Sequence, residues 1–261
     1  MNPISNRQLT LLRKLQRKKY REQEQLFLVE GRRAVKQVVE NGVLDVKALF
    51  FDKTGKLWTE PAFEQFADQW PSAVVEESDY RDVTDTQSPQ GICALCRMPG
   101  EGDLDEMSGS GGVIVATDRI QDPGNLGTIY RSAGWFGVAG LLLGEGTVDP
   151  FNPKVVRSTA GSTGILPFAH VSLSHTLAHF EEQQWRILLL DASEEAADIG
   201  QLNTRKPTVL VIGNEAGGID PSLYGGRSRT PVKIPARGTH RQVESLNASI
   251  ALSIALYAVT A

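Results

Sequence analysis

Three glycine-bearing segments in the second half of the chain hold the polar residues that could do chemistry. They are residues 118–131, 211–219 and 234–249, and each follows or touches the end of a predicted strand. Open α/β sheets bind their ligands at such ends. None of the three segments matches G-x-G-x-x-G after a first strand, and G-x-x-x-x-G-K-[ST] is absent. An ordinary dinucleotide or nucleoside-triphosphate site is therefore poorly supported.

In the first segment, Pro123 and Gly124 predict a turn, and a helix from Asn125 places Thr128 and Arg131 on one face. A lone arginine on such a helix is most often a surface residue. In the second segment, Glu215 follows an apolar strand by three residues, inside a glycine-rich turn whose free backbone N–H groups can hold polar ligand atoms. The alternative for Glu215 is a helix-capping acid.

The third segment places Ser245 and Asn247 beside the start of a long apolar helix. Either residue could serve only as the N-cap of that helix, because serine and asparagine are preferred cap residues. Taken alone, each of the three segments is a weak indication of a site.

The elements that must position these residues form an α/β alternation beyond residue 112. Apolar strands with helices between them predict a sheet covered on both faces. The expected strands are 113–117, 140–143, 187–190, 208–212 and 232–234, and the expected helices are 125–136 and a closing helix, 243–259.

The first half reads as a smaller α/β domain, residues 1–97. It begins with a helical rhythm of leucines and continues with strand 25–30, helix 32–41, strands 46–51, 73–75 and 91–97, and a helix at 63–70 between them. Cys93 and Cys96 fall on opposite faces of the last strand, so neither a shared metal nor a disulfide is expected. Residues 98–112 are rich in glycine and serine and predict a linker.

Charge is distributed unevenly along the chain. Residues 1–33 hold nine basic and three acidic residues, a balance of +6, which leaves −10 for the remainder of a chain with formal net charge −4. A basic end on an acidic body fits contact with a polyanion such as RNA through one surface. The alternatives are a solvated helix face or a mitochondrial presequence, since residues 1–21 contain no acid.

Two further classes are disfavoured. No apolar run approaches 18 residues and nothing resembles a secretory signal, so we expect a cytoplasmic protein without a membrane span. His175 and His179 have helical i, i+4 spacing, but no glutamate lies between them in a metalloprotease pattern and no third ligand is evident. We therefore expect no metal site.

Taken together, the segments resemble the SpoU family of RNA ribose methyltransferases, part of the SPOUT superfamily. The resemblance covers most of residues 113–261. It rests on N-x-G-x-x-x-R from Asn125 to Arg131, G-N-E-x-x-G from Gly213 to Gly218, I-P at Ile234, S-L-N at 245–247 and the segment 152–161. Residues 5–97 are similar to the family's ribosomal-protein-like substrate-binding domain, at Tyr20-Arg21, at Phe27-Leu-Val-Glu-Gly31 and at Ser88-Pro-Gln-Gly-Ile92.

This resemblance implies a fold, a cofactor and partners. The expected fold is an α/β C-terminal domain (113–261) tied in a trefoil knot, with an N-terminal RNA-binding domain (1–97). S-adenosylmethionine would lie in the knot, a homodimer would form partly through the closing helix, and ribosomal RNA is favoured over transfer RNA as substrate.

It also implies roles for particular residues. The reacting nucleotide would be surrounded by Asn125, Arg131, Glu215, Ser245 and Asn247. The cofactor would be held around Gly213, Asn214, Ile234 and Leu246. RNA would be contacted by Arg13, Arg17, Lys18, Arg21 and Arg157.

The proton acceptor is open between two residues. A guanidinium has a pKa above about 12 and is a poor base near neutrality. We therefore expect Arg131 to clamp a phosphate and stabilise alkoxide charge, and Glu215 to accept the proton or only to orient Asn125 or Arg131.

The sequence also departs from the family pattern. The loop from Gly238 to Glu244 is lengthened and adds His240 and Arg241, and Ala236 stands where methionine is common. Two other functions therefore stay open, a non-catalytic RNA-binding or ribosome assembly factor on the same fold and a transfer RNA methyltransferase.

Overall fold

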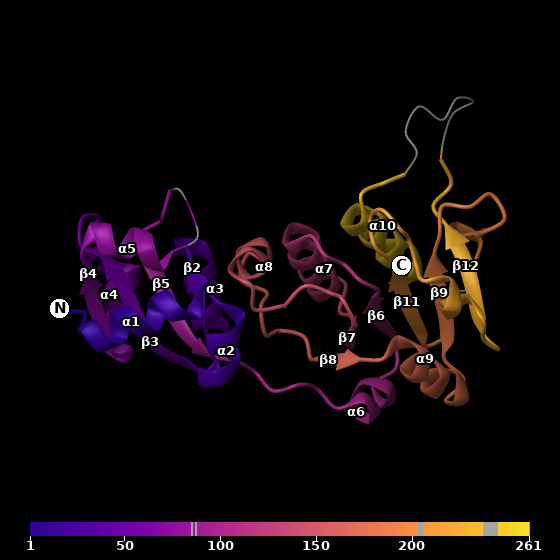
Figure 1. The fold of residues 1–261 in the computed structure, drawn as a ribbon, viewed down its shortest axis with the longest axis horizontal. Helices are drawn as coiled ribbons and strands as arrows, with labels where there is room; N and C mark the ends of the chain where they lie inside the picture. Colours follow the sequence, from indigo (N-terminus) through magenta and orange to yellow (C-terminus); the bar gives the residue numbers. More distant parts are fainter. Residues whose placement is uncertain (85, 87, 203–205, 237–244, 261) are drawn as a thin grey trace. The chain divides into compact units, whose positions relative to one another are not determined.

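The computed structural model describes residues 1–84, 86, 88–202, 206–236 and 245–260, which divide into two compact units. Unit 1 comprises Met1–Gly100 and Asp149–Ile165, and unit 2 comprises Glu101–Val148 and Leu166–Ala261. Each unit contains its own sheet, so the predicted α/β class is confirmed (Figure 1).

Unit 1 is built on a five-stranded mixed sheet in the order β1-β4-β3-β5-β2. Strand β3 pairs parallel with β4 and antiparallel with β5. The strands are β1 (Asn2–Pro3), β2 (Leu26–Glu30), β3 (Val46–Asp52), β4 (Ser72–Val75) and β5 (Ile92–Arg97). The helices are α1 (Asn6–Leu15), α2 (Lys18–Glu24), α3 (Arg32–Asn41), α4 (Pro61–Gln69), α5 (Glu77–Val83) and α8 (Pro153–Ser158), with the 3-10 turn η1 (Leu57–Thr59).

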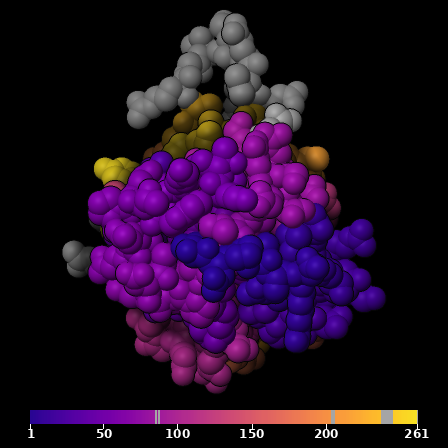
Figure 2. Space-filling view, turned by 90° about the vertical axis from the view of Figure 1, so that its left-hand side faces the viewer, coloured from indigo at the N-terminus to yellow at the C-terminus, as the bar shows by residue number. Residues whose placement is uncertain are grey.

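The basic N-terminal segment forms two helices that cover part of this sheet. Leu9, Leu12 and Leu15 recur on one face of α1 and are buried in a core that includes Phe50 and Tyr80. The opposite face of α1 and most of α2 stay at the surface, and Figure 2 shows these first residues in indigo on one side of unit 1. The leucine rhythm therefore identified the buried face correctly.

The two cysteines lie in β5, as expected, and both thiols are free and buried. Burial raises the pKa of Cys93 well above its ordinary value and that of Cys96 to about 12, because a thiolate is poorly solvated in an apolar interior. Both groups are therefore neutral core residues.

Arg21 was expected to contact RNA, and the structure contradicts that prediction. Its side chain is 3% exposed, donates to the backbone oxygen of Leu15 and forms an ion pair with Asp149. A guanidinium removed from water needs such a partner to offset its lost hydration. Arg21 is thus a structural residue of unit 1.

The segment Asp149–Ile165 belongs to unit 1, although the sequence assigned it to the C-terminal domain. The ring of Phe151 packs on Phe27 with centroids 4.9 Å apart, and Arg157 lies 3.6 Å from the carboxylate of Glu30. Both partners, Phe27 and Glu30, lie in β2, more than a hundred positions earlier in the chain, so neighbouring sequence could not reveal them.

The expected linker at 98–112 is also wrong in part, because it contains helix α6 (Leu104–Gly109). Asp103 caps this helix by accepting from the backbone of Asp105 and Glu106, and Met107 is buried in the core of unit 2. A helix of six residues that packs only Leu104 and Met107 on the core is too short to show an apolar period.

Unit 2 contains a seven-stranded sheet in the order β10-β12-β9-β11-β6-β7-β8, and every pairing in it is parallel. Its strands are β6 (Val113–Thr117), β7 (Gly140–Gly144), β8 (Phe168–Val171), β9 (Arg186–Leu190), β10 (Ala197–Asp198), β11 (Thr208–Ile212) and β12 (Arg229–Lys233). Its helices are α6, α7 (Pro123–Trp135), α9 (Leu173–Glu182) and α10 (Ala248–Thr260), with the 3-10 turns η2 (Ile199–Gln201) and η3 (Pro221–Tyr224).

Helices cover this sheet on both faces, as its apolar strands predicted. One face packs against α6 and α9 in a single core, which contains Ile114, Ala116, Leu142, Ile187, Val209, Met107, Leu177 and Phe180. The alternate strand residues point to the other face and are fully buried as well, for example Val115, Leu188 and Leu210. Helices α7 and α10 lie side by side (Figure 1), joined by a 2.7 Å hydrogen bond between Ser132 and Ser253.

The closing helix was expected from residue 243, but α10 begins at Ala248 and residues 245–247 precede it. Asn247 caps it by accepting from the backbone N–H groups of Ser249 and Ile250. The trefoil knot stays a prediction, because the connecting residues 237–244 lie outside the described residues. Within the part of the chain that is described, no helix is long and apolar enough to cross a membrane.

The ion pair of Arg21 generates a prediction about stability. Arg21→Ala should lower the free energy of unfolding of unit 1 by about 3–5 kcal/mol, because it leaves Asp149 without its buried partner. Lys18→Ala removes only an exposed i, i+4 pair with Glu22 and should cost about 0.5 kcal/mol. Urea denaturation, monitored by amide hydrogen exchange in β3 and β5, measures the free energy of unfolding of unit 1 in each variant. Equal values for Arg21→Ala and Lys18→Ala would contradict the structural role of Arg21.

Candidate functional site

The side chain of Asn125 joins the three polar segments of unit 2. Asn125 lies in the first turn of α7 and is 9% exposed. Its Nδ2 donates to Oε1 of Glu215 at 2.5 Å, and its Oδ1 accepts from Nδ2 of Asn247 at 2.9 Å. The two partners are 90 and 122 positions away in the chain. The fold thus brings together three of the five residues expected around the reacting nucleotide.

Each residue of this network is placed by the element that bears it. Asp122 caps α7 and accepts from the backbone N–H of Asn125 at 2.8 Å, which fixes the start of the helix. Asn247 holds the N-terminus of α10 with its Oδ1 and reaches Asn125 with its Nδ2. Asn247 therefore has both of the roles that the sequence left as alternatives: it caps α10, and it belongs to the polar network of the site.

Beside the network, a cavity of about 650 Å³ is lined by the residues expected to hold the cofactor. Those residues are Gly213, Asn214, Ile234 and Leu246. Glu215 and Ser245 also line it, together with apolar residues such as Ile212, Ile219 and Ala251. The size falls within the range of small-molecule pockets, and the combination of an apolar lining with a few polar groups is typical of them.

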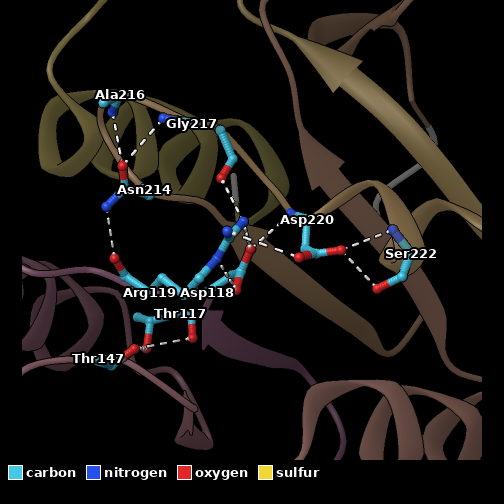
Figure 3. A network of polar contacts seen from close by, with 10 residues as sticks. Thr117, Asp118, Arg119, Thr147, Asn214, Ala216, Gly217, Asp220 and Ser222 are labelled. Atoms are coloured by element: carbon cyan, nitrogen blue, oxygen red, sulfur yellow. Dashed lines mark hydrogen bonds and ion pairs between the residues drawn. The ribbon is translucent and has the colours of Figure 1, made fainter.

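The turn after β11 is held by a polar network that the sequence did not predict (Figure 3). Nδ2 of Asn214 donates to the backbone oxygen of Arg119, and its Oδ1 accepts from the backbone of Ala216 and Gly217. Asp118 is buried and accepts from the backbone N–H of Asp220 at 2.7 Å. The cofactor-lining turn is therefore fixed from both ends.

Arg119 completes this network in an uncommon backbone conformation. Its φ is 55°, a left-handed value that L residues seldom adopt. The guanidinium forms two 3.0 Å hydrogen bonds with the carboxylate of Asp118, and that carboxylate raises the pKa of Arg119. The fork geometry of arginine matches a carboxylate in this way and offsets part of the backbone cost.

Within the turn, Gly213 is required by close packing. A Cβ atom on Gly213 would lie 2.3 Å from the backbone carbon of Gly218 and the backbone nitrogen of Ile219. No side chain fits at that distance, so the backbone would have to move.

A second polar pair lies at another part of the cavity. The hydroxyl of Tyr224 donates to Oδ2 of Asp191 at 3.0 Å. Burial, followed by this carboxylate, raises the pKa of Tyr224 to about 12. The hydroxyl consequently keeps its proton near neutrality, and Asp191 is held in place as an acceptor for a ligand donor.

The structure does not bring the other two expected residues into the network. Arg131 is exposed on α7 and forms no ion pair or hydrogen bond with any residue that the structure describes. Ser245 lines the cavity but makes no hydrogen bond within the described residues. The loop residues Gly238, His240, Arg241 and Glu244 lie outside those residues.

The residues expected to contact RNA in unit 1 differ in their availability. Arg13 is half exposed and paired with both Asp79 and Asp82, and Lys18 is paired with Glu22. Arg17 is exposed, and Arg157 is partly buried beside Glu30. Only some of the basic charge in the first 33 residues is therefore available to a polyanion.

Sequence reasoning missed Ser249, Asp118 and Asp220. Ser249 is buried, donates to Oδ1 of Asn247 at 2.7 Å and lies 3.3 Å from Oδ1 of Asn125. Asp118 follows β6 directly, at the carboxyl end of a parallel strand, and that position was a usable signal. Asp220 donates its backbone N–H to Asp118 and places its carboxylate 3.8 Å from Arg119, a contact 101 positions apart that no local sequence pattern shows.

Comparison with known proteins gives a consistent result. Residues 112–257 match the model of the SpoU rRNA Methylase family, and residues 6–94 match the MRM3-like substrate binding domain. The chain is 29% identical over 245 residues to the 23S rRNA (guanosine(2553)-2′-O)-methyltransferase RlmP of Bacillus subtilis, covering 94% of this chain and 92% of that protein. It is 30% identical over 239 residues to the 23S rRNA (uridine(2479)-2′-O)-methyltransferase of Streptomyces viridochromogenes, covering 87% and 80%.

Solved structures agree with these relatives. The SpoU methyltransferase AviRb from Streptomyces viridochromogenes in complex with AdoMet matches with a TM-score of 0.83 at 26% identity, covering 98% of this chain and 97% of that one. An AdoMet-bound rRNA methyltransferase from Sinorhizobium meliloti matches with a TM-score of 0.80 at 26% identity, covering 99% and 96%.

The packing of Gly213 predicts an effect on cofactor binding. Gly213→Ala should weaken S-adenosylmethionine binding about tenfold or more, since overpacking costs about 1–3 kcal/mol and must displace the turn. Gly217→Ala is the matched control, because its Cβ would meet only Oδ1 of Asn214, at 4.0 Å. Titration calorimetry on both folded variants measures the effect, and equal affinities would show that the turn does not shape the cofactor site.

Proposed function

The chain belongs to the SpoU rRNA methylase family, and on that premise we propose that it transfers a methyl group from S-adenosylmethionine to a ribose 2′-hydroxyl of RNA. The observation that carries the proposal is the Asn125 network, because it joins two carboxamides to a carboxylate, that of Glu215, which lines a cavity suited to the donor. Both relatives compared above are named as ribose methyltransferases of 23S rRNA, which favours ribosomal RNA as the substrate.

The cavity residues fit the donor chemically. S-adenosylmethionine supplies its methyl group on a positively charged sulfur, which is the electrophile. The backbone groups around Gly213 and Asn214 offer polar contacts, Ile234 and Leu246 offer apolar surface, and the Asp191 carboxylate offers an acceptor for an N–H or O–H group. Structures named as AdoMet-bound share the fold at TM-scores of 0.80 and 0.83.

Glu215 is the proton acceptor in this proposal. A ribose hydroxyl is a poor nucleophile, so its proton must be removed or shared as the new bond forms. Oε1 of Glu215 is engaged by Asn125, and Oε2 makes no hydrogen bond with any described residue, which leaves it for the hydroxyl. Asn125 then holds the carboxylate in position and also binds Asn247.

Arg131, unlike Glu215, is assigned to binding the RNA substrate. It is exposed and free of ion pairs among the described residues, which suits a guanidinium that pairs with the phosphate flanking the target ribose. The same charge would stabilise an alkoxide as it develops. Ser245 lines the cavity and would contact the nucleotide or donor there.

The rival without turnover, an RNA-binding assembly factor, is less well supported. A protein that only binds RNA does not require a carboxylate held by a buried carboxamide, as Glu215 is, or a donor-sized cavity beside that carboxylate. A transfer RNA substrate is disfavoured by the names of the relatives that the chain covers almost fully. Action in the cytoplasm stays a prediction from the sequence.

RNA affinity in the proposal comes partly from unit 1. Arg17, Lys18 and Lys19 are exposed at the start of α2, and Arg13 lies one helix earlier. Neutralising phosphates with such residues releases counterions and makes binding depend on salt. Arg157, partly buried beside Glu30, would contact the RNA as well.

We also propose a homodimer. Ile250, Ile254 and Tyr257 recur at i, i+4 and i+7 on α10 and are exposed, Tyr257 by 66%. Trp135, at the end of the adjoining helix α7, is 85% exposed. Contiguous apolar surface of this kind marks an interaction face, and a second copy of the chain is the partner that the family resemblance implies. The trefoil knot that the family resemblance implies would lie beneath this apolar face of α10.

The role of Arg131 can be separated from donor binding. Arg131→Ala should leave the dissociation constant for S-adenosylmethionine unchanged and lower kcat for methyl transfer to ribosomal RNA by about 10²–10³. Arg227→Ala, another exposed arginine of unit 2, is the control and should keep full activity. Transfer of a radioactive methyl group measures the rate; loss of donor binding in folded Arg131→Ala would overturn the assignment.

The apolar face of α10 predicts how the chain associates. Ile254→Asp places a charge at the centre of that face and should shift the protein from dimer to monomer in sedimentation velocity at micromolar concentration. Val43→Asp alters an exposed apolar residue of unit 1 and should leave association unchanged. A wild-type protein that sediments as a monomer would remove the proposed dimer.

A further inference from the structure

Three segments that carry the family resemblance take no part in the methyl-transfer site, yet they meet at one cavity in unit 1. They are the end of β2 with Gly31, residues 88–92, and the segment that carries Arg157 of α8 and Ala160. The cavity has a volume of about 200 Å³, and all of its lining residues belong to unit 1. Its polar lining consists mainly of Glu30, Arg33, Thr84, Ser88, Gln90 and Arg157.

A buried carboxylate is the most distinctive group in this cavity. The side chain of Glu30 is 5% exposed, and Arg157 lies 3.6 Å from it. A carboxylate has about four lone-pair sites, so Glu30 can accept further hydrogen bonds beside those it makes within the chain. Because its charge would repel a phosphate at close range, the floor of the cavity suits a neutral group that donates N–H bonds.

Gln90 and Arg33 add donors around this carboxylate. Oε1 of Gln90 accepts from the backbone N–H of Arg32 at 2.9 Å, which fixes the carboxamide at the start of α3 and leaves the Nε2 hydrogens for an acceptor. Arg33 is exposed and forms no ion pair with any described residue, whereas its neighbour Arg32 pairs with Glu60. Arg33 is thus available to a negative charge outside the cavity.

We propose that this cavity binds an unpaired guanine base of the RNA substrate, with Glu30 accepting from N1–H and the N2 amine. Guanine is the RNA base that presents two adjacent N–H donors, and its O6 and N7 acceptors suit the N–H groups of Arg157 and Gln90. Arg33 pairs with the phosphate of the same nucleotide. Sequence-specific proteins commonly recognise RNA through such splayed-out bases.

The size and lining of the cavity support this occupant. About 200 Å³ is enough for one nucleobase and too little for a whole nucleotide, so the ribose and phosphate remain outside. Ala34, Pro89, Ile92 and Ala160 supply the apolar surface for the faces of the ring. The inference rests on the proposed function insofar as it takes the ligand to be RNA.

The test uses the full-length protein and labelled uridine hexamers that carry one central guanosine, inosine or adenosine. Inosine lacks only the N2 amine, so it should bind about tenfold more weakly than guanosine in fluorescence anisotropy. Glu30→Gln should abolish this preference, because its amide donor would face the donors of the base. Equal affinities for the three hexamers, or no measurable binding of any, would overturn the proposal.

A second variant covers the case in which Glu30→Gln does not fold. Ser88 is exposed at the cavity and makes no hydrogen bond within the described residues, so Ser88→Trp fills the space without breaking a contact. It should also remove the guanosine preference, whereas Ser78→Trp, on α5 and away from the cavity, should keep it. A preference that persists in Ser88→Trp would contradict the proposal.

These binding measurements are independent of methyl transfer. If the guanosine preference is found and no methyl group is transferred, the cavity assignment stands and the enzyme assignment fails. If methyl transfer is found with no base preference, the reverse holds.

Discussion

The carboxamide of Asn125 is buried, and a buried amide must have both its oxygen and its nitrogen hydrogen-bonded, because each unsatisfied group costs about 1–3 kcal/mol. The partners that satisfy it, Glu215 and Asn247, come from the turn after β11 and from the start of α10. The same bonds that complete the amide therefore bring a carboxylate and a helix N-terminus to one place. Asp122 fixes the amide in turn by capping α7, so the site depends on the correct start of that helix.

The turn that carries Glu215 shows how the backbone is shaped for the site. Gly213 allows the two arms of the turn to approach more closely than any Cβ permits, and Asp118 and Arg119 hold the arms from the neighbouring loop. Neither Asp118 nor Arg119 lines the cavity itself, but the guanidinium of Arg119 lies 3.5 Å from the backbone oxygen of Gly218, which does. The positive φ of Arg119 indicates that backbone strain is accepted here in exchange for the ion pair with Asp118.

Most of the strands and all three polar segments could be predicted from the sequence, because apolar runs and glycine turns are local features. Asn125, Glu215 and Asn247 were grouped by the resemblance of these segments to the SpoU family, and the structure joins them by hydrogen bonds. Arg21 was misjudged because its charge is visible in the sequence, while its partner Asp149 lies 128 positions away. The assignment of 149–165 to unit 1 also depends on distant contacts. So does the bond between Asp118 and Asp220, in which the backbone N–H of Asp220 donates to the Asp118 carboxylate across 102 positions.

The central claim is that the Asn125 network serves methyl transfer to a ribose oxygen, and the product tests it most directly. The protein would be incubated with unmodified ribosomal RNA and S-adenosylmethionine carrying a deuterated methyl group, and the RNA then digested to nucleosides for mass spectrometry. The account predicts that the deuterated methyl appears on the ribose fragment of one nucleoside and is lost in Glu215→Ala. Label on a base, or no label with protein that binds the donor, would contradict it.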